Sequence, residues 1–241
     1  MKNQARVVVI GGGVVGVSTL YHLVKKGWAD CVLIERKELT SGSTWHAAGL
    51  LPLFNMSYSV GQIHKYSVDL YGRLEQETGQ YAGLSRVSNI RLATTQDRMD
   101  EYRQYAGVAQ TIGVQVDILT PDEVVDIWPL AVKDNLIGAI RHPMDGYIQP
   151  ADLTQALAKG ARDNGGEIYR NTNVTSITRT PSGEWKVTTD KGEITCEHIV
   201  SATGNFARRT GEMVGLDIPV IPVEHQYICL LYTSPSPRDF Q

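Results

Sequence analysis

The chain has 241 residues, of which 42% are hydrophobic and 20% charged, and its formal net charge is −3 at pH 7. The sequence has no block of Lys or Arg and no apolar run near the roughly 20 residues that span a bilayer, so we expect neither nucleic-acid nor membrane binding. Its three cysteines, Cys31, Cys196 and Cys229, are too few and too scattered for a disulfide framework or a metal site, which predicts no metal centre and a reduced, cytoplasmic setting.

The N-terminal segment has the pattern of a dinucleotide-binding unit. A β-branched run at residues 6–10 predicts a buried strand, and Gly11, Gly13 and Gly16 follow it as G-x-G-x-x-G. Apolar residues at helical spacing come next, and the second predicted strand ends in the acidic residue Glu35. Strand, glycines, helix, strand and terminal acid within about 30 residues form a specific signature, whereas the glycines alone would be a weak one.

Each part of this unit has a physical task. Gly11 permits the tight turn, Gly13 lets the backbone approach a pyrophosphate, and Gly16 lets the helix pack closely on the strand. The N-terminus of the helix offers free N–H groups to phosphate, and Glu35 is placed to accept hydrogen bonds from a ribose 2′-hydroxyl. The predicted cofactor-binding residues here are Gly11, Gly13, Val14, Val15, Gly16, Glu35 and Arg36.

The middle of the chain mixes helical and strand patterns after a loop of small residues at 36–53. The helix expected at residues 57–77 has Ile63, Tyr66, Leu70 and Leu74 on one face. Further helices are predicted at 96–112, from Pro121, and from Pro150 to Gly165, and further strands at 87–94 and 136–142.

A change from helical to alternating period marks the last part of the fold. Residues 173–180, 184–189 and 193–196 predict a three-stranded meander with two Gly-containing turns. A separate buried strand is expected at 197–204, ending in small residues that return to the cofactor. Val174, Thr203 and Gly204 are therefore added to the predicted cofactor-binding residues.

This order favours a two-lobed flavoprotein over a plain NAD dehydrogenase, because the chain returns to the nucleotide after an insertion. The predicted fold is α/β, with a Rossmann-like FAD-binding domain in three layers that include the β-meander, interleaved with an α+β substrate lobe. We assign residues 1–53 and 146–215 to the FAD-binding domain and residues 54–145 and 216–228 to the substrate lobe.

Several stretches resemble the dimethylglycine/sarcosine dehydrogenase family, within the glycine-oxidase-like FAD-dependent amine oxidoreductases. They are "VVVIGGGVVGVSTLYHL", "LIERKELTSGSTWHAAG", "DGYIQPADLTQALAKGAR", "SATGNFARRTGEMVGL" and "PVEHQY". The resemblance runs from Val7 to about Tyr227, and "GSTWHAAG" and "HQY" are its specific pieces.

The resemblance implies a role for His46, which matches a histidine that the family bonds covalently to the 8-methyl carbon of the flavin. Such attachment needs a neutral ring nitrogen as nucleophile. The alternative is a histidine that only packs or hydrogen-bonds near the flavin. The hydroxyls of Ser43 and Thr44 are expected to bond phosphate or ribitol.

His225 matches the "HQY" histidine, which in the family lies at the substrate amine, so the resemblance implies a catalytic residue there. A base or acceptor near the amine favours the unprotonated form, whose lone pair stabilises the developing iminium. The alternative is a strand-exposed histidine without a catalytic role.

The implied reaction is oxidative demethylation of an N-methylated amino acid, dimethylglycine or sarcosine in type. Hydride passes from an N-methyl carbon to flavin N5, and water releases formaldehyde unless folate captures the one-carbon unit. The expected oxidant is oxygen or an electron-transfer flavoprotein. Relatives of this type carry a C-terminal folate-binding domain, which we expect in the missing part of the protein. Two alternatives stay open: a glycine- or D-amino-acid-oxidase-like primary amine oxidase with noncovalent FAD, and a truncated, inactive dinucleotide-binding fragment.

The final residues, 229–241, fit neither the fold nor the family and resemble one reading frame of a sequencing-library adapter. We expect native sequence to stop near Ile228 and the rest of the flavin domain to be missing. A natural Ser/Pro-rich tail is the alternative.

Overall fold

The computed structural model describes residues 1–224 and Gln226. His225 and the predicted adapter-derived tail at 229–241 lie outside these residues. The helices are α1 (Val14–Lys25), α2 (Tyr58–Thr78), α3 (Gln96–Ile112), α4 (Pro121–Ile127), α5 (Pro150–Asp163), the 3₁₀ helix Gly204–Phe206 and α6 (Ala207–Glu212). The strands are β1 (Gln4–Ile10), β2 (Cys31–Ile34), β3 (Leu50–Leu51), β4 (Leu84–Arg86), β5 (Asn89–Ala93), β6 (Asp117–Leu119), β7 (Gly138–His142), β8 (Gly146–Ile148), β9 (Glu167–Tyr169), β10 (Val174–Arg179), β11 (Trp185–Thr189) and β12 (Gly192–Ser201).

The largest sheet has the order β10-β11-β12-β1-β2-β9. Strands β12, β1, β2 and β9 are parallel, and β10 and β11 add an antiparallel meander. From β1 the chain proceeds to β2 and β9, then returns to the other side of β1 as β12. A ligand crevice is expected at such a reversal, outside the carboxyl ends of the strands.

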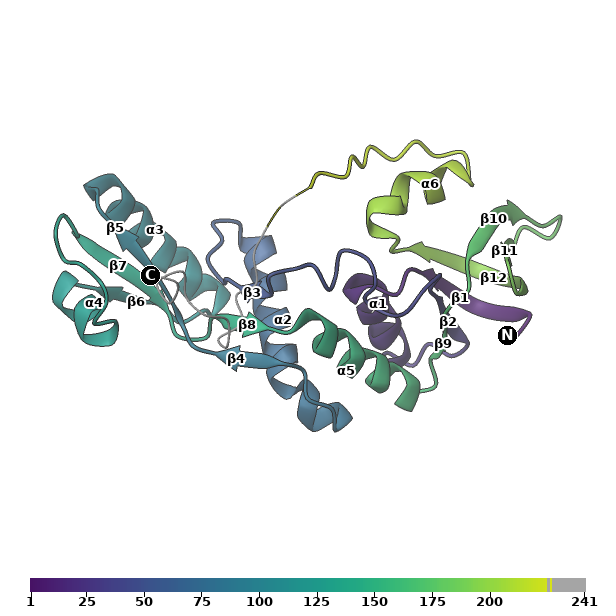
Figure 1. Cartoon of the computed structure of the whole chain (residues 1–241), viewed down its shortest axis with the longest axis horizontal. Coiled ribbons are helices and arrows are strands. Elements are labelled where there is room, and N and C mark those ends of the chain that lie inside the picture. Colours follow the sequence, from purple (N-terminus) through teal and green to yellow (C-terminus); the bar gives the residue numbers. More distant parts are fainter. Residues whose placement is uncertain (225, 227–241) are drawn as a thin grey trace, which may run out of the picture.

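The parallel strands form the middle of three layers. On one face Val7, Val9 and Leu33 pack in a core with residues of α1 and α5. On the other face Val8 and Ile34 share a core with the meander. The predicted α/β fold with a meander layer is confirmed, and Figure 1 shows these elements in the half of the molecule that contains the N-terminus.

The second half contains two small antiparallel sheets, β3-β8-β4 and β5-β7-β6. Helix α3 covers one face of the β5-β7-β6 sheet through Met99, Tyr102 and Tyr105, which share a core with Ala93 and Ile140. Helices α2 and α5 lie between the two halves (Figure 1). The domain boundaries after residues 53, 145 and 215 stay predictions.

One sequence expectation about the strands is wrong. Residues 193–196 and 197–204 were expected to form two strands, but β12 runs without a break from Gly192 to Ser201. Its residues from Gly192 to Cys196 pair antiparallel with β11, and those from Thr195 to Ser201 pair parallel with β1. A single strand therefore carries the chain from the meander to the crevice, because an alternating pattern and a buried run can share one extended backbone.

The apolar face expected for α2 is only half correct. Leu70 and Leu74 are buried, whereas Ile63 is 64% exposed and Tyr66 is 48% exposed. The N-terminal half of α2 instead packs against α3, where a Cβ on Gly61 would lie 2.5 Å from Ile112 Cδ1. The helix meets different partners along its length, so its buried face changes.

A buried polar cluster fixes the chain where it enters the second half. The Asp145 carboxylate accepts a hydrogen bond from Leu53 N at 3.0 Å, and Tyr105 Oη donates to Leu53 O at 3.0 Å. Burial raises the pKa of Asp145 to about 6 and lowers the pKa of neighbouring His142 to about 4. His142 is therefore a neutral, structural residue near pH 7.

Among the described residues, no helix is long and apolar enough to cross a membrane.

Glu77 links α2 to α1 and provides a test of this packing. Hydrogen bonds from Lys25 and Tyr21 lower the pKa of Glu77 from 4.5 to about 2, and Arg73 also contacts it. A carboxyl whose pKa is lowered by folding stabilises the fold above the unfolded pKa, and the contribution disappears as pH falls through the folded value. Because the Glu77 side chain is 28% exposed, solvent screening limits this contribution.

We expect Glu77→Gln to lower the free energy of unfolding at pH 7 by about 1 kcal/mol. The difference from wild type should narrow below pH 4.5, as measured by urea unfolding at a series of pH values. Glu75→Gln, an exposed change on the same helix, is the matched control and should have little effect. If the two variants lowered the free energy of unfolding equally at pH 7, the stabilising contact of Glu77 with α1 would be contradicted.

Candidate dinucleotide site

A cleft of about 1030 Å³ opens at the carboxyl ends of β12, β1 and β2. It brings together residues that lie up to 216 positions apart in the sequence, from Ile10 to Gln226. Gly16 is buried behind the cleft, and His225 lies outside the described residues. The predicted cofactor-binding residues that line the cleft are Gly11, Gly13, Val14, Val15, Glu35, Arg36, Ser43, Thr44, His46, Val174, Thr203 and Gly204.

The glycine loop is closely packed against the end of β12. Gly11 has φ of +115°, and a Cβ there would lie 2.4 Å from Ala202 O. A Cβ on Gly16 would lie 1.9 Å from Gly11 O and 3.2 Å from Ala202 Cβ. Neither position accepts a side chain without moving backbone, so the loop is held close to the end of the strands.

Helix α1 begins at this loop, with Gly13 as its N-cap and no side-chain cap from that residue. Instead, Thr44 Oγ1 accepts a hydrogen bond from Val14 N at 3.0 Å, and Thr40 N donates to Gly12 O at 3.0 Å. The loop that carries His46 is therefore bonded directly to the start of α1. The Thr44 hydroxyl keeps its own proton for a further acceptor, and the helix terminus keeps its positive potential.

Glu35 contacts the backbone around it. One carboxylate oxygen accepts from Gly12 N at 2.6 Å and the other from Lys37 N at 2.8 Å. A carboxylate can accept about four hydrogen bonds, so capacity for a ribose hydroxyl remains. Arg36, the next residue, lies with its guanidinium carbon 3.8 Å from the centre of the Phe206 ring.

His46 is held in a tight turn at the edge of the cleft. Its Nδ1 lies 2.9 Å from Gly42 O, and the imidazole stacks on Trp45 with ring centres 4.0 Å apart. A carbonyl oxygen only accepts, so Nδ1 carries the proton and Nε2 has the free lone pair in the neutral ring. The turn thus fixes the tautomer of a neutral imidazole that lines the cleft.

The comparison with known families agrees with this geometry. A profile described as "DAO: FAD dependent oxidoreductase" matches residues 6–240. The chain belongs to the FAD-dependent oxidoreductase family.

Curated members of this family include close relatives of the chain. It is 44% identical to the mitochondrial dimethylglycine dehydrogenase of Rattus norvegicus over 227 residues, covering 94% of this chain and 26% of the relative. It is 35% identical to the mitochondrial sarcosine dehydrogenase of Homo sapiens, covering 95% of this chain and 26% of that protein. The chain therefore spans about a quarter of the length of these relatives. The resemblance predicted from the sequence is confirmed.

A solved structure of the family has the same fold. Glycine oxidase from Geobacillus kaustophilus matches with a TM-score of 0.74 and 30% identity, covering 89% of this chain and 59% of that chain. The cleft meets the requirements of the FAD of this family: a glycine loop in which a Cβ at Gly11 would overlap Ala202 O, the N-terminus of α1 and an acid that follows β2. Within residues 1–224 and Gln226, no group of three or more His, Cys, Asp or Glu could hold a metal ion.

Several residues of the cleft were not identified from the sequence. Gly12 has the closest packing of these, since a Cβ there would lie 2.8 Å from Glu35 and Leu39 side-chain atoms. Phe206 and Arg209 follow the Ala-Thr-Gly strand end at helical spacing, a signal that could have found them. Thr172 and Asn173 belong to a turn without a motif. The others include Ser41 and Thr210.

The packing of Gly16 gives a direct test of the cradle. We expect Gly16→Ala to lower the free energy of unfolding by about 3 kcal/mol, because the new methyl group overlaps Gly11 O. FAD added to the folded fraction should bind more weakly, as measured by quenching of flavin fluorescence.

The control is Gly107→Ala, in the middle of α3, where a Cβ meets nothing within 4 Å. We expect it to raise the free energy of unfolding by up to about 1 kcal/mol through helix propensity and to leave FAD binding unchanged. A stable Gly16→Ala protein with wild-type FAD affinity would refute the described packing.

Proposed function

We propose that the protein uses FAD to oxidise N-methylated amino acids of the dimethylglycine or sarcosine type. The observation that carries the proposal is the position of His46, bonded through its turn to the start of α1 at the dinucleotide cleft. The 44% identity to rat dimethylglycine dehydrogenase supports the substrate class. A flavin bound in the cleft supplies the electron-accepting chemistry, and the protein supplies binding and orientation.

The proposal includes covalent attachment of the flavin to His46. The Gly42 carbonyl holds the proton on Nδ1, which leaves Nε2 as the nucleophile. In the noncovalent alternative, the His46 imidazole only packs against the flavin or hydrogen-bonds to it. His225 keeps its predicted role at the substrate amine.

The wider setting is also proposed. Reduced flavin is reoxidised by oxygen or by an electron-transfer flavoprotein, and a folate-binding domain captures the one-carbon unit. The buried free thiols of Cys31 and Cys196 support a reducing compartment, the cytoplasm in our prediction, although the rat and human relatives are mitochondrial by name. The glycine-oxidase similarity supports a primary amine oxidase as the second candidate.

Substrate class is tested by anaerobic flavin reduction. We expect the yellow purified protein to lose its absorption when dimethylglycine or sarcosine is added, because hydride leaves a carbon next to a tertiary or secondary amine. Glycine, which lacks the N-methyl group, is the matched compound and should leave the absorption unchanged. Bleaching by glycine alone would support the primary amine oxidase instead. Oxygen uptake during turnover then distinguishes the two oxidants.

Covalent attachment is tested by precipitating the protein with acid and washing the pellet. Wild type should keep its flavin, and His46→Ala should release nearly all of it while still binding FAD before precipitation. His198→Ala, at an exposed histidine away from the cleft, should behave as wild type. Complete release from wild type would exclude the covalent bond and leave the noncovalent role.

A further inference from the structure

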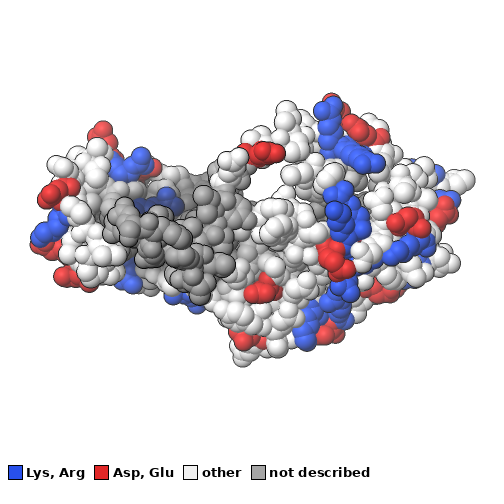
Figure 2. Space-filling view, in the orientation of Figure 1, with Lys and Arg blue, Asp and Glu red and all other residues white. Residues whose placement is uncertain are grey.

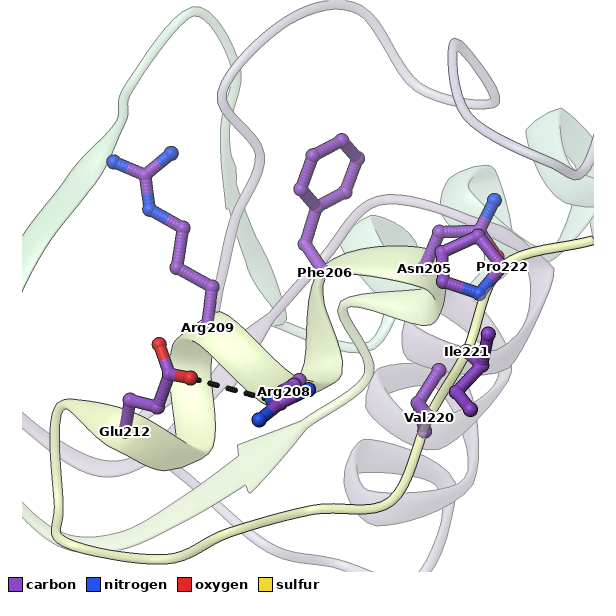
Figure 3. Close-up of a pocket in the computed structure, with 8 residues that line it drawn as sticks. All are labelled: Asn205, Phe206, Arg208, Arg209, Glu212, Val220, Ile221 and Pro222. Atoms are coloured by element: carbon purple, nitrogen blue, oxygen red, sulfur yellow. Dashed lines mark ion pairs between the residues drawn. The ribbon is translucent and has the colours of Figure 1, made fainter.

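One face of α6 lines the dinucleotide cleft, although α6 carries no known nucleotide motif. Phe206 and Arg209 are three residues apart, and both line the cleft. Figure 3 shows their side chains extending to the same side of the helix. Arg208, between them, instead pairs with Glu212 at 3.4 Å (Figure 3). It also pairs with Asp217 at 3.6 Å. Two neighbouring arginines therefore have different surroundings.

Phe206 connects this face to the opposite side of the cleft. The Arg36 guanidinium carbon lies 3.8 Å from the centre of its ring, within the range of a cation–π contact. Arg36 follows β2 and Phe206 follows β12, and these strands flank β1 in the sheet. The contact thus crosses the carboxyl end of β1, where the glycine loop begins.

Two acids, Glu35 and Glu224, line the cleft together with Arg36 and Arg209. Among the described residues, neither Arg36 nor Arg209 forms an ion pair within 4.0 Å, and both are exposed. The carboxylate of Glu35 is bonded to Gly12 N and Lys37 N. The N-terminus of α1 adds positive potential on the facing wall. Figure 2 shows Lys or Arg side chains next to Asp or Glu side chains where α6 lies in Figure 1. Two unpaired guanidinium groups beside a helix N-terminus favour an anion with more than one charge.

We propose that Arg36, Phe206 and Arg209 form a clasp that retains the adenosine diphosphate part of the dinucleotide and sets its release rate. Arg209 and Arg36 balance the diphosphate charge, and Phe206 provides an aromatic face for adenine. Since Arg36 and Phe206 contact each other across the cleft, their contact opens and closes with entry and release. The inference rests on the proposed use of FAD and adds residues that the glycine signature does not include.

Binding of ADP and of adenosine tests the arginines and Phe206 separately, because only ADP carries the diphosphate. Neither ligand involves flavin chemistry. We expect Arg209→Gln to weaken ADP binding about tenfold, which corresponds to the loss of one charge-assisted hydrogen bond. Adenosine has no phosphate, so its binding should weaken by less than about twofold. Arg209→Lys should restore most of the ADP affinity. Arg208→Gln removes the same charge one residue away and should leave both affinities within about twofold of wild type. Calorimetry measures all four proteins.

Phe206→Leu tests the aromatic part. It should weaken both ADP and adenosine by about fivefold, within the range of one aromatic–base stacking contact, and speed FAD dissociation by a similar factor. Adding salt should reduce the difference between wild type and Arg209→Gln but not the difference for Phe206→Leu. Thermal unfolding of each variant confirms that it folds.

The outcomes separate this inference from the proposed function. Wild type that binds neither ADP nor FAD would overturn the dinucleotide site itself. Wild type that binds ADP, with Arg209→Gln equal to Arg208→Gln and Phe206→Leu unchanged, would overturn only the clasp. Equal loss of ADP and adenosine in Arg209→Gln would show a structural role for that residue and also reject the clasp.

Discussion

The close approach of three backbone segments at the end of β1 is the constraint on which the site depends. Gly11 turns the chain with a φ that other residues avoid, Gly16 packs on its carbonyl, and Ala202 at the end of β12 leaves no room for a Cβ on either. This packing brings the start of α1 to the carboxyl edge of the sheet. A phosphate-binding helix terminus exists here because three small residues meet, and not because of any charged side chain.

The His46 loop depends on the same constraint. Thr44 bonds to Val14 N and Thr40 N bonds to Gly12 O, so the turn is fixed to the glycine loop rather than standing independently. Within this turn, Gly42 O accepts a hydrogen bond from the His46 imidazole, and the Trp45 ring packs against it. Asp145 and Tyr105 then hold Leu53, where the chain leaves for the second half. The His46 turn is therefore anchored at the glycine loop, and the same segment is anchored again at Leu53 before it enters the second half.

The sequence predicted those parts in which local pattern and burial agree. The β1-α1-β2 unit, the first two strands of the meander and the helix at 96–112 depend on short-range spacing, and each was located correctly. The short strands β3, β4, β6 and β8 have two or three residues, too few for an alternating pattern to be read. The predicted burial of Ile63 and Tyr66 was wrong, because tertiary structure decides which partner each part of α2 meets. Tyr66 bonds His22 Nε2 at 2.9 Å and stays 48% exposed. Phe206 was missed because its role arises from Arg36, 170 positions earlier in the chain.

The central claim is that this cleft holds a flavin dinucleotide whose ring reaches His46. The most direct measurement is the absorption spectrum of the purified full-length gene product, followed by mass spectrometry of its peptic peptides. We predict a yellow protein with equimolar FAD and a peptide that contains His46 and is heavier by the mass of the flavin group. A protein that stays colourless after incubation with FAD would contradict the account.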